Sequence, residues 1–374
     1  MLVTAAVATG PRRAFVRREV ELDEPRAGEV RVRLVATGVC HTDAKVRDRM
    51  APGARPIVLG HEGAGVVEAL GPGAGQVTEP AGVSGRAEIA VGDHVVLSFD
   101  HCGACRHCLA GTPSYCLEYD ARNFGGARAD GTTAFRLDGE PVGSHFFGQS
   151  SFADRTNAAI ASVIPVPRDL PLELLAPLGC GVLTGAGAVW HALDAQPGGS
   201  FAVFGAGAVG LSAVLAAVVA GSETIIAVDR HPARLELAAE LGATHVVDAS
   251  REDAEARILD ITRGGIDRAL DTTGAPAVFT TMLRSLGIRG RAAGVAGAPS
   301  VDFPTQHLLL RGAGAVMLVQ GDARPREIVP RLVELWQAGR FPLERLVRTY
   351  EADAIDDAVA DSASGATIKP VLVR

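Results

Sequence analysis

Two groups of cysteine and histidine side chains in this 374-residue chain could bind metal. The first holds four of the six cysteines in the spacing Cys-x2-Cys-x2-Cys-x7-Cys: Cys102, Cys105, Cys108 and Cys116. Four thiolates this close suit tetrahedral Zn²⁺, and a closed set leaves no position for a reacting molecule. A zinc ion here would therefore be structural. Buried reduced thiols, disulfides and an iron–sulfur cluster are the alternatives, and the tight spacing disfavours mutual disulfides.

The second group is dispersed along the chain. Cys40 stands in GVCHTD, His61 in GHEGAG and Cys180 in PLGCG. Alone, the histidine would be read as a hydrogen-bonded structural residue and Cys180 as a small core residue. Together they supply two thiolates and one imidazole, which leaves a fourth tetrahedral position free for water or an alcohol oxygen. Their glycine-rich surroundings favour this second interpretation, a catalytic zinc.

A third pattern, GAGAVG, contains Gly205, Gly207 and Gly210. It follows an apolar run at 201–204 and opens an apolar helical stretch at 211–220. Glycines let the backbone turn tightly and approach a pyrophosphate, which the amino end of a helix attracts. The pattern therefore predicts a dinucleotide site.

The choice of dinucleotide depends on the end of the next apolar run, IIAVD. Asp229 is its last residue, where a carboxylate can accept hydrogen bonds from both ribose hydroxyls and repel a 2′-phosphate. Arg230 could tolerate a phosphate, or it is a surface charge at the start of a loop. Arg234, in the adjoining helical stretch, is a further candidate for coenzyme contact. NAD is expected, with NADP less favoured.

Two kinds of element must position these residues. Over about the first 162 residues, short β-rich runs at 30–35, 65–69 and 94–98 alternate with glycine and proline turns. From about residue 174 the pattern changes to strand, glycine turn and helix. Strands are expected at 201–204, 225–228, 268–271, 292–295 and 315–319, and helices at 232–241 and 276–286. This succession predicts a parallel sheet, while a helix at 325–338 and strands at 347–350 and 371–373 are expected to return to the first domain.

The composition excludes several classes of function. With 36 Lys and Arg against 43 Asp and Glu, the formal charge is −7, so the chain has no electrostatic reason to bind nucleic acid or anionic lipid. The start lacks the pattern of a secretory signal, and no unbroken apolar stretch of about 20 residues appears. A cytoplasmic, two-domain α/β enzyme without membrane contact is expected.

The segments GHEGAGVVEALGPGA and GAGAVG, with the four-cysteine cluster, resemble the zinc-containing medium-chain alcohol dehydrogenases. Within that family, LVATGVCHTD, VGSHFFGQSSFA and PLELLAPLGCG most resemble the bacterial aryl-alcohol (benzyl-alcohol) dehydrogenases. The resemblance implies a GroES-like β-rich catalytic domain at 1–181 and 321–374, with a structural zinc lobe at about 100–118. It also implies a Rossmann NAD-binding domain at 182–320 and an active site in the cleft between the two domains.

The resemblance also implies roles for residues near the dispersed cysteines. Thr42 matches the hydroxyl residue that touches the substrate oxygen, and His41 the basic residue that reaches the coenzyme pyrophosphate. Asp43 is expected to hold the second nitrogen of His61, or to cap a helix. Glu62 matches a carboxylate that lies behind the metal and assists ligand exchange, or it is a buried paired acid.

Three further positions concern proton release and substrate choice. Many relatives carry a proton-relay histidine where this chain has Lys45, so either Lys45 passes the proton or the ribose releases it to water. Phe146 and Phe147 fall where relatives line the substrate channel, although they could be ordinary core residues. Aromatic walls favour benzyl, cinnamyl or allylic terpenoid alcohols such as geraniol.

The expected function is reversible, NAD-linked oxidation of these primary alcohols to aldehydes, with two Zn²⁺ per subunit. A thiol-dependent dehydrogenase acting on formaldehyde adducts of glutathione or mycothiol is the main alternative. A non-catalytic NAD(H)-binding protein and a zinc-free quinone reductase are disfavoured, because they leave Cys40, His61, Cys180 and Thr42 without purpose. Relatives pair through an edge strand, so 315–319 suggests a homodimer or homotetramer.

Overall fold

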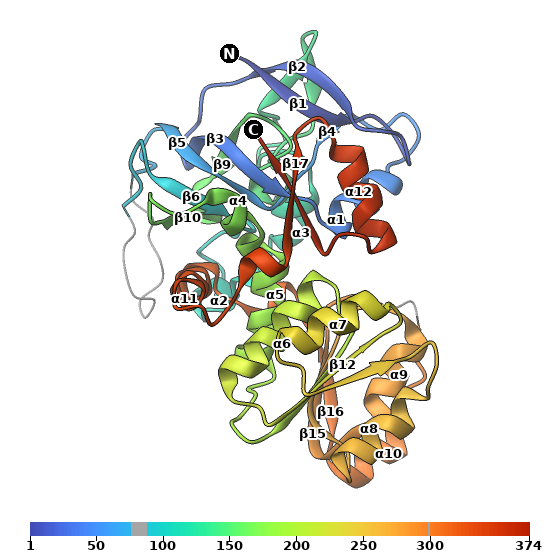
Figure 1. Ribbon diagram of the computed structural model, residues 1–374. Coiled ribbons are helices and arrows are strands. Elements are labelled where there is room, and N and C mark those ends of the chain that lie inside the picture. The colour runs from blue at the N-terminus through green and yellow to red at the C-terminus, as the bar shows by residue number, and fades with distance from the viewer. Residues whose placement is uncertain (76–87, 298–299) are drawn as a thin grey trace. The chain divides into compact units, whose positions relative to one another are not determined.

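The computed structural model describes residues 1–75, 88–297 and 300–374 (Figure 1). Internal contacts divide the chain into two units. The first comprises 1–180, 324–334 and 342–374, and the second comprises 181–323 and 335–341. The domain limits expected from the sequence, 1–181 with 321–374 and 182–320, stay a prediction. Most of the polar loop at 73–89, whose role the sequence does not indicate, lies outside the described residues.

Two β-sheets form the first unit. One has the order β4-β1-β2-β7-β8, with β1 Leu2–Ala8, β2 Val16–Leu22, β4 Ile57–Val58, β7 Phe135–Leu137 and β8 Glu140–Val142. The other has the order β10-β6-β5-β3-β18-β17, and β9 also pairs with β3. Its strands are β3 Glu29–Gly38, β5 Gly63–Leu70, β6 His94–Leu97, β9 Arg155–Ala159, β10 Val163–Val166, β17 Val347–Glu351 and β18 Lys369–Val373.

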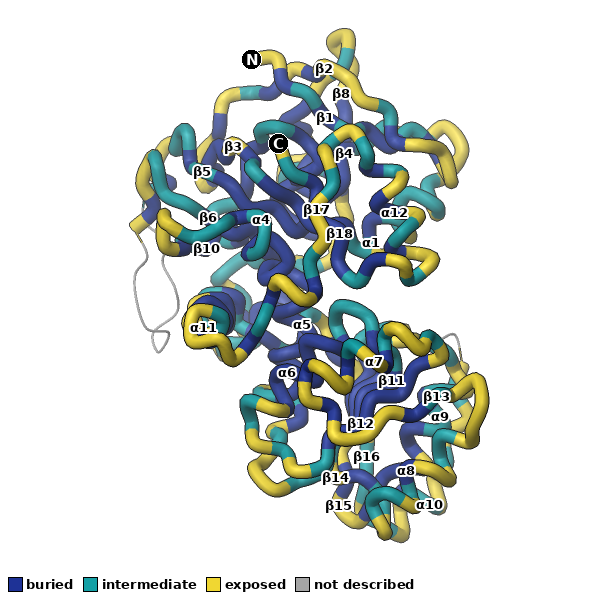
Figure 2. The backbone as a smooth tube through the Cα atoms, in the orientation of Figure 1, coloured by how far each residue is buried: buried dark blue, intermediate teal, exposed yellow. Residues whose placement is uncertain are grey.

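Alternating apolar residues explain why β3 lies at the centre of the larger sheet. Val30, Val32 and Leu34 are buried and pack with Val67 of β5 and Leu97 of β6 in one cluster. β3 and β6 are buried over most of their length, and β5 is buried mainly in its first half (Figure 2). Cys40 follows the end of β3, and His61 precedes the start of β5.

Short helices connect the strands of the first unit. They are α1 His41–Asp48, α2 Arg106–Leu109, η1 Pro113–Tyr115, α3 Tyr119–Phe124, η2 Phe146–Gly148, η3 Ile160–Ser162, α4 Leu172–Leu175, η4 Ala176–Gly179, η7 Leu343–Arg345 and α12 Ile355–Ser364. The helix α11 Pro325–Gln337 belongs to the first unit over most of its length. The C-terminal strand β18 runs antiparallel to β3 with Val371 opposite Gly38, which places it beside the segment that leads to Cys40.

The second unit contains a six-stranded sheet in the order β13-β12-β11-β14-β15-β16, with parallel pairing throughout. The strands are β11 Ser200–Phe204, β12 Thr224–Asp229, β13 His245–Asp248, β14 Ile266–Asp271, β15 Leu286–Gly294 and β16 Gly314–Met317. The helical elements are α5 Gly181–Gly187, η5 Ala188–Ala192, α6 Ala208–Ala220, α7 Pro232–Glu240, α8 Ala254–Thr262, α9 Pro276–Arg284, α10 Thr305–Arg311 and η6 Gln320–Asp322.

Helices cover both faces of this sheet. Side chains of α8, α9 and α10 share one buried cluster with β11, β12, β14 and β15, and Figure 1 shows α6 and α7 on the opposite face. A parallel sheet buried on both faces needs nearly continuous apolar strands, which explains sequences such as FAVF and TIIAVD. Among the described residues, no single helix is long and apolar enough to cross a membrane, although one bent pair, 172–179 with 181–192, passes on length and composition alone.

Some predicted element limits are wrong. The helix expected at 276–286 ends at Arg284, because Leu286 begins β15, where it is fully buried and pairs with Ile266. The helix expected at 211–220 begins at Ala208, directly after Gly207. The end of the first helix thus depends on strand pairing of Leu286 and not on local propensity.

Candidate active site

The dispersed metal-binding candidates meet in the first unit. Potential ligand atoms of Cys40, His61, Glu62 and Cys180 lie within 4.8 Å of one another. Cys40 lies between β3 and α1, His61 and Glu62 directly precede β5, and Cys180 directly follows η4. Because β3 and β5 are paired neighbours, the ends of these two strands bring Cys40 and His61 together. His61 is 1% exposed and Cys180 is 8% exposed, so the set is largely shielded from water.

Asp43 connects the two ligand-bearing segments. Its Oδ1 lies 2.9 Å from His61 Nδ1 and accepts a hydrogen bond from Gly60 N, while its Oδ2 accepts one from Cys40 N. A carboxylate in this position fixes the histidine tautomer, so that Nε2 is the nitrogen left to bind a metal. Burial opposes protonation of His61, but the charge of Asp43 and their hydrogen bond raise its pKa well above the usual value.

The two thiols of the set shift each other's pKa values in opposite directions. Their mutual hydrogen bond lowers the pKa of Cys40 well below its usual value, with the charge of Lys369 acting in the same direction. The same hydrogen bond, together with burial, raises the pKa of Cys180 well above its usual value. The protein alone therefore favours one thiolate here, and a divalent cation would stabilise both. Among the described residues, the buried Nε2 of His61 has no hydrogen-bond partner, so it is available as a metal ligand. Two thiols and one such imidazole nitrogen are a donor set that fits zinc.

Lys369 is a functional candidate that the sequence analysis does not identify. It lies in β18, and its Nζ is 2.8 Å from Glu62 Oε1, with both side chains almost fully buried. Burial raises the pKa of Glu62 although Lys369 lowers it. Glu62 is thus a buried, paired acid next to the ligand set. The only signal in the sequence is a single lysine within the apolar C-terminal run IKPVLV.

The first turns of α1 carry the remaining predicted residues of this region. Thr42 is half-buried, and its Oγ1 is 3.8 Å from Cys40 Sγ, so its hydroxyl lies beside the ligand set. His41 and Lys45 are exposed on the same helix. Their roles toward coenzyme pyrophosphate and proton release stay predictions.

Aromatic rings pack directly against the histidine. The ring of Phe147 stacks on His61 at 4.5 Å between centroids, and Phe146 meets it edge-on at 5.5 Å. Two aromatic residues that the sequence analysis does not identify, Tyr119 and Phe124 of α3, meet Phe147 edge-on at 6.5 and 5.0 Å. Phe124 is 45% exposed, whereas Phe146 and Phe147 are buried. The cluster therefore extends from His61 to the solvent.

The turn that presents these phenylalanines is strained. His145, Phe147 and Ser150 have φ values of 58°, 53° and 57°, in the left-handed region that favours glycine. Such residues cost on the order of 1–3 kcal/mol each and persist only where the surroundings hold them. The hydroxyl of Ser150 is anchored, because it donates to Val58 O and accepts from Phe146 N.

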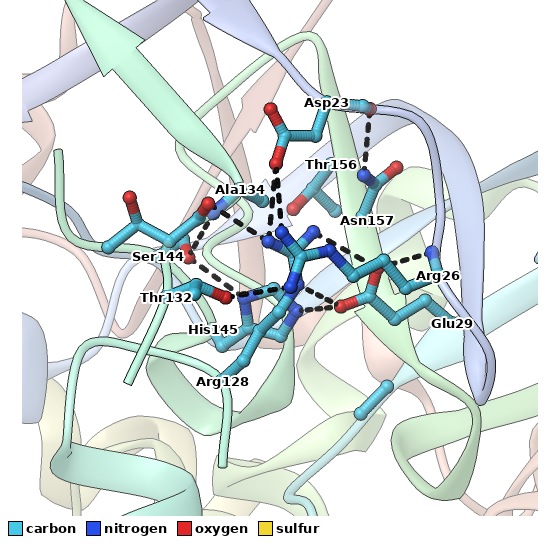
Figure 3. A network of polar contacts seen from close by, with 12 residues as sticks. Asp23, Arg26, Glu29, Arg128, Thr132, Ala134, Ser144, His145, Thr156 and Asn157 are labelled. Carbon is cyan, nitrogen blue, oxygen red and sulfur yellow. Dashed lines mark hydrogen bonds and ion pairs between the residues drawn. The ribbon is translucent and has the colours of Figure 1, made fainter. Parts of the chain in front are cut away.

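A buried polar network holds the other end of the turn (Figure 3). Glu29 Oε1 lies 2.8 Å from His145 Nε2 and 2.6 Å from Arg128 Nε, and Ser144 Oγ lies 2.9 Å from His145 Nδ1. Burial favours the protonated acid, but hydrogen bonds from His145 and Arg128 lower the pKa of Glu29 from 4.5 to about 2. The network therefore fixes His145 through an ionised carboxylate.

The four-cysteine cluster forms a second compact group in the first unit. The sulfur atoms of Cys102, Cys105, Cys108 and Cys116 lie within 4.8 Å of one another, and all are free thiols. Backbone N–H groups point at the sulfurs: Cys105 N donates to Cys102 Sγ, and Cys102 N donates to Cys116 Sγ. Backbone hydrogen bonds from Cys108 and Leu117 lower the pKa of Cys105 to about 6. The loop thus stabilises a thiolate at Cys105, whereas burial raises the pKa values of Cys108 and Cys116. A bound cation would be needed to stabilise all four thiolates.

The glycine motif of the second unit lies between β11 and α6. Gly205 has φ +97°, and a Cβ on Gly210 would come within 1.8 Å of Gly205 O, so the turn requires both glycines. A Cβ on Gly207 would meet nothing within 4 Å. The fold itself therefore does not require this glycine, and the open space beside the amino end of α6 suits the close approach of a pyrophosphate.

Asp229 lies at the end of β12, beside this turn. Its Oδ2 accepts a hydrogen bond from Ala206 N, and its Oδ1 accepts from Arg230 N and His231 N. Arg234 Nη1 lies 3.9 Å from Oδ2. The structure thus brings Asp229 and Arg234 together next to the glycine turn, where they could contact a coenzyme ribose.

Comparison with known families gives two matches. Residues 26–167 match the alcohol dehydrogenase GroES-like domain, and residues 208–337 match the zinc-binding dehydrogenase family. The chain is 43% identical over 360 residues to geraniol dehydrogenase of Castellaniella defragrans, covering 95% of this chain and 93% of that protein. It is 35% identical over 377 residues to S-(hydroxymethyl)glutathione dehydrogenase of Escherichia coli, covering 98% of each.

Solved structures give the same result. The crystal structure of benzyl alcohol dehydrogenase from Acinetobacter calcoaceticus is 44% identical and has a TM-score of 0.92, with 100% of this chain and 99% of that chain covered. The chain belongs to the zinc-containing medium-chain alcohol dehydrogenases, a family whose cofactors are zinc and NAD. The predicted fold class, a GroES-like part with a Rossmann sheet, is confirmed.

Proposed function

We propose that this chain oxidises primary aromatic or allylic alcohols to aldehydes, with NAD as coenzyme and two Zn²⁺ per subunit. The observation that carries the substrate class is the ring of Phe147 stacked on His61 and extended to the surface by Phe124. A planar benzyl or allylic group would pack against such rings next to the reacting oxygen. The similarity to geraniol and benzyl alcohol dehydrogenases supports the same class.

Cys40, His61 and Cys180 would hold the catalytic zinc, and Gly205, Gly207 and Gly210 with Asp229 would hold NAD. When bound, these groups supply a Lewis acid that lowers the pKa of an alcohol and a nicotinamide that accepts a hydride. Asp43 keeps His61 in one tautomer, and the cluster of Phe146 and Phe147 limits the access of water to the set. These residues therefore orient the reactants before any bond changes.

Oxidation of RCH2OH to RCHO transfers a hydride to NAD⁺ and releases one proton from the alcohol oxygen. Thr42 is placed to receive that proton, because its hydroxyl lies beside Cys40. From there, Lys45 on the exposed side of α1, or water, would carry it away. The reverse reaction uses the same atoms, so the enzyme would also reduce aldehydes with NADH.

NAD is proposed over NADP because Asp229 occupies the position beside the glycine turn where a 2′-phosphate would need to lie. A homodimer or homotetramer is proposed because β16 ends the parallel sheet and leaves Val316 and Met317 about half exposed. An apolar edge strand of this kind is suited to pairing with a second copy.

The test follows NADH absorbance with benzyl alcohol, geraniol, ethanol, and formaldehyde with and without glutathione or mycothiol, each with NAD or NADP. Fastest turnover of benzyl alcohol or geraniol with NAD, and two zinc ions per subunit, would support the proposal. Turnover restricted to formaldehyde in the presence of a thiol would overturn the substrate class in favour of the alternative, which the similarity to S-(hydroxymethyl)glutathione dehydrogenase motivates. Zinc-free activity would overturn the metal assignment.

A further inference from the structure

One buried amide joins the backbone segments that carry the proposed metal ligands. Gln149 is fully buried at the end of the strained turn. Its Nε2 donates hydrogen bonds to His61 O and Ser98 O, and its Oε1 accepts one from Gly63 N, each at 3.0 Å. Two donor contacts to carbonyls and one acceptor contact to an N–H fix the orientation of the amide. Gln149 is thus hydrogen-bonded to the backbone of the residues on both sides of Glu62, which are His61 and Gly63.

The contacts continue to the third ligand. Ser98, which follows β6, donates from its Oγ to Gly179 O at 2.6 Å, and Gly179 directly precedes Cys180. The approach is close, because a Cβ on Gly179 would come within 2.0 Å of Leu97 O. One side chain, Gln149, is therefore hydrogen-bonded to His61 and connected through Ser98 to the peptide before Cys180.

The same turn also contacts the imidazole ring of His61. Phe147, two residues before Gln149, stacks on the His61 ring. The strained backbone on either side of these two residues is anchored by Glu29 at His145 and by Val58 at Ser150. Backbone and ring of His61 are therefore both held by one short segment, 147–149.

We propose that Gln149 is a positioning residue, which holds His61 and, with Ser98, Cys180 at the separation that the catalytic metal requires. This inference rests on the proposed function. Without the amide, the carbonyls of His61 and Ser98 and the N–H of Gly63 would be left unpaired in a buried region, and their segments would shift to regain partners. Residues that orient metal ligands typically alter metal affinity about 10–100-fold when replaced.

The experiment compares the full-length wild-type enzyme with Gln149→Met, which preserves side-chain length and removes all three hydrogen bonds. Asn157→Leu is the matched control, since Asn157 is a buried amide of the same unit whose side-chain N–H donates to Asp23 O and not to His61 or Ser98. Release of zinc to a chelator is followed for both metal sites, and the visible spectrum is recorded after Co²⁺ replaces the catalytic zinc.

For Gln149→Met we expect release from the catalytic set to accelerate about 10–100-fold and the Co²⁺ absorption to shift, while release from the four-cysteine cluster stays unchanged. Asn157→Leu should leave both readouts as in the wild type. Ser98→Ala, which keeps the amide and removes only the bond to Gly179, should shift the Co²⁺ spectrum in the same direction by less. If Gln149→Met does not fold, the Co²⁺ spectrum of Ser98→Ala tests the positioning role in its place.

Wild-type release and an unchanged Co²⁺ spectrum in folded Gln149→Met would overturn the positioning role while leaving the proposed function intact. Equal effects of Gln149→Met and Asn157→Leu would also overturn it, because they would indicate general loosening of the unit. A wild-type enzyme that binds no metal at Cys40, His61 and Cys180 would overturn the proposed function together with this inference.

Discussion

The two candidate metal sites of the first unit are built in opposite ways. The four-cysteine cluster lies within one loop, and that loop's own N–H groups donate to its sulfurs. The dispersed set takes Cys40, His61 and Cys180 from distant parts of the chain. Its geometry depends on buried side chains between those parts, chiefly Asp43 and Gln149. A local site can form with its loop, whereas the dispersed site requires the whole unit to fold.

The surroundings of the two sites differ in chemistry as well. Four thiols fill a tetrahedral shell, which suits a structural role. The dispersed set provides two thiols and an imidazole, with a hydroxyl, a buried Glu62–Lys369 pair and stacked aromatic rings beside it. The function of each site therefore depends on what lies next to the ligands more than on the number of cysteines.

Loss of a ligand from the dispersed set should abolish turnover, whereas the four-cysteine cluster is not expected to take part in the reaction. Cys180→Ala removes one ligand of the dispersed set, so turnover should fall by about 10³-fold or more, since Lewis-acid stabilisation is worth several kcal/mol. Zinc content should fall from two ions to one per subunit, and NADH binding should persist. Wild-type turnover in this variant would contradict the ligand assignment.

Loss of a ligand from the four-cysteine cluster should affect stability instead of turnover. Cys116→Ala should release the zinc of the four-cysteine cluster and lower the free energy of unfolding by several kcal/mol, because metal binding there contributes to folding. Thermal unfolding and zinc content measure the effect. The metal held by Cys40, His61 and Cys180 should remain in the protein that stays folded. Loss of both ions together would show that the two sites are not independent.

A smaller effect is expected when Asp43, which holds the ligand His61, is replaced. Asp43→Asn keeps the shape but weakens the contact with His61 Nδ1, so zinc affinity at that set should fall about 10–100-fold. Competition with a chelator measures the change, and the four-cysteine cluster should be unaffected. Asp48→Asn, in the same helix and ion-paired with Arg47, serves as the control.

A further expected effect concerns pH and the turn that faces the dispersed set. The pKa of Glu29 is lowered to about 2 in the folded protein, so its ionised form stabilises the fold. Glu29→Gln should therefore cost about 2–3 kcal/mol near neutral pH. Because the folded pKa lies below the unfolded one, this difference should be complete above about pH 4.5 and shrink as the pH falls toward 2.

Urea unfolding of wild type and Glu29→Gln across the acidic range measures that difference. Glu19→Gln, at an exposed position of β2, is the control and should show no such dependence. A difference that stays constant down to pH 3 would contradict the role assigned to the ionised carboxylate.

Local patterns predicted a large part of this protein. The spacing of Cys102, Cys105, Cys108 and Cys116 indicated a metal cluster, because all its atoms belong to one short loop. The motif at Gly205, with apolar runs on either side, indicated the strand, turn and helix that are present. Parallel strands were predictable because burial on both faces demands continuous apolar residues.

Contacts between distant residues were not predictable from the sequence. Nothing in it indicates that Lys369 pairs with Glu62, 307 positions away. The left-handed conformations of His145 and Phe147 were also unpredictable, because local sterics oppose them and only the surrounding network maintains them. Gln149 stands within the segment VGSHFFGQSSFA, but an amide shows its role only when its three partners are in place.

By itself, the sequence determined which groups could bind metal and coenzyme, because donor type and short-range spacing are properties of the chain. The way in which Cys40, His61 and Cys180 converge, and the residues that surround them, are properties of the folded unit. That arrangement arises from strand pairing and from hydrogen bonds of buried Asp43 and Gln149. Such bonds stabilise a geometry only once water is excluded, and no local segment of the chain can exclude water alone.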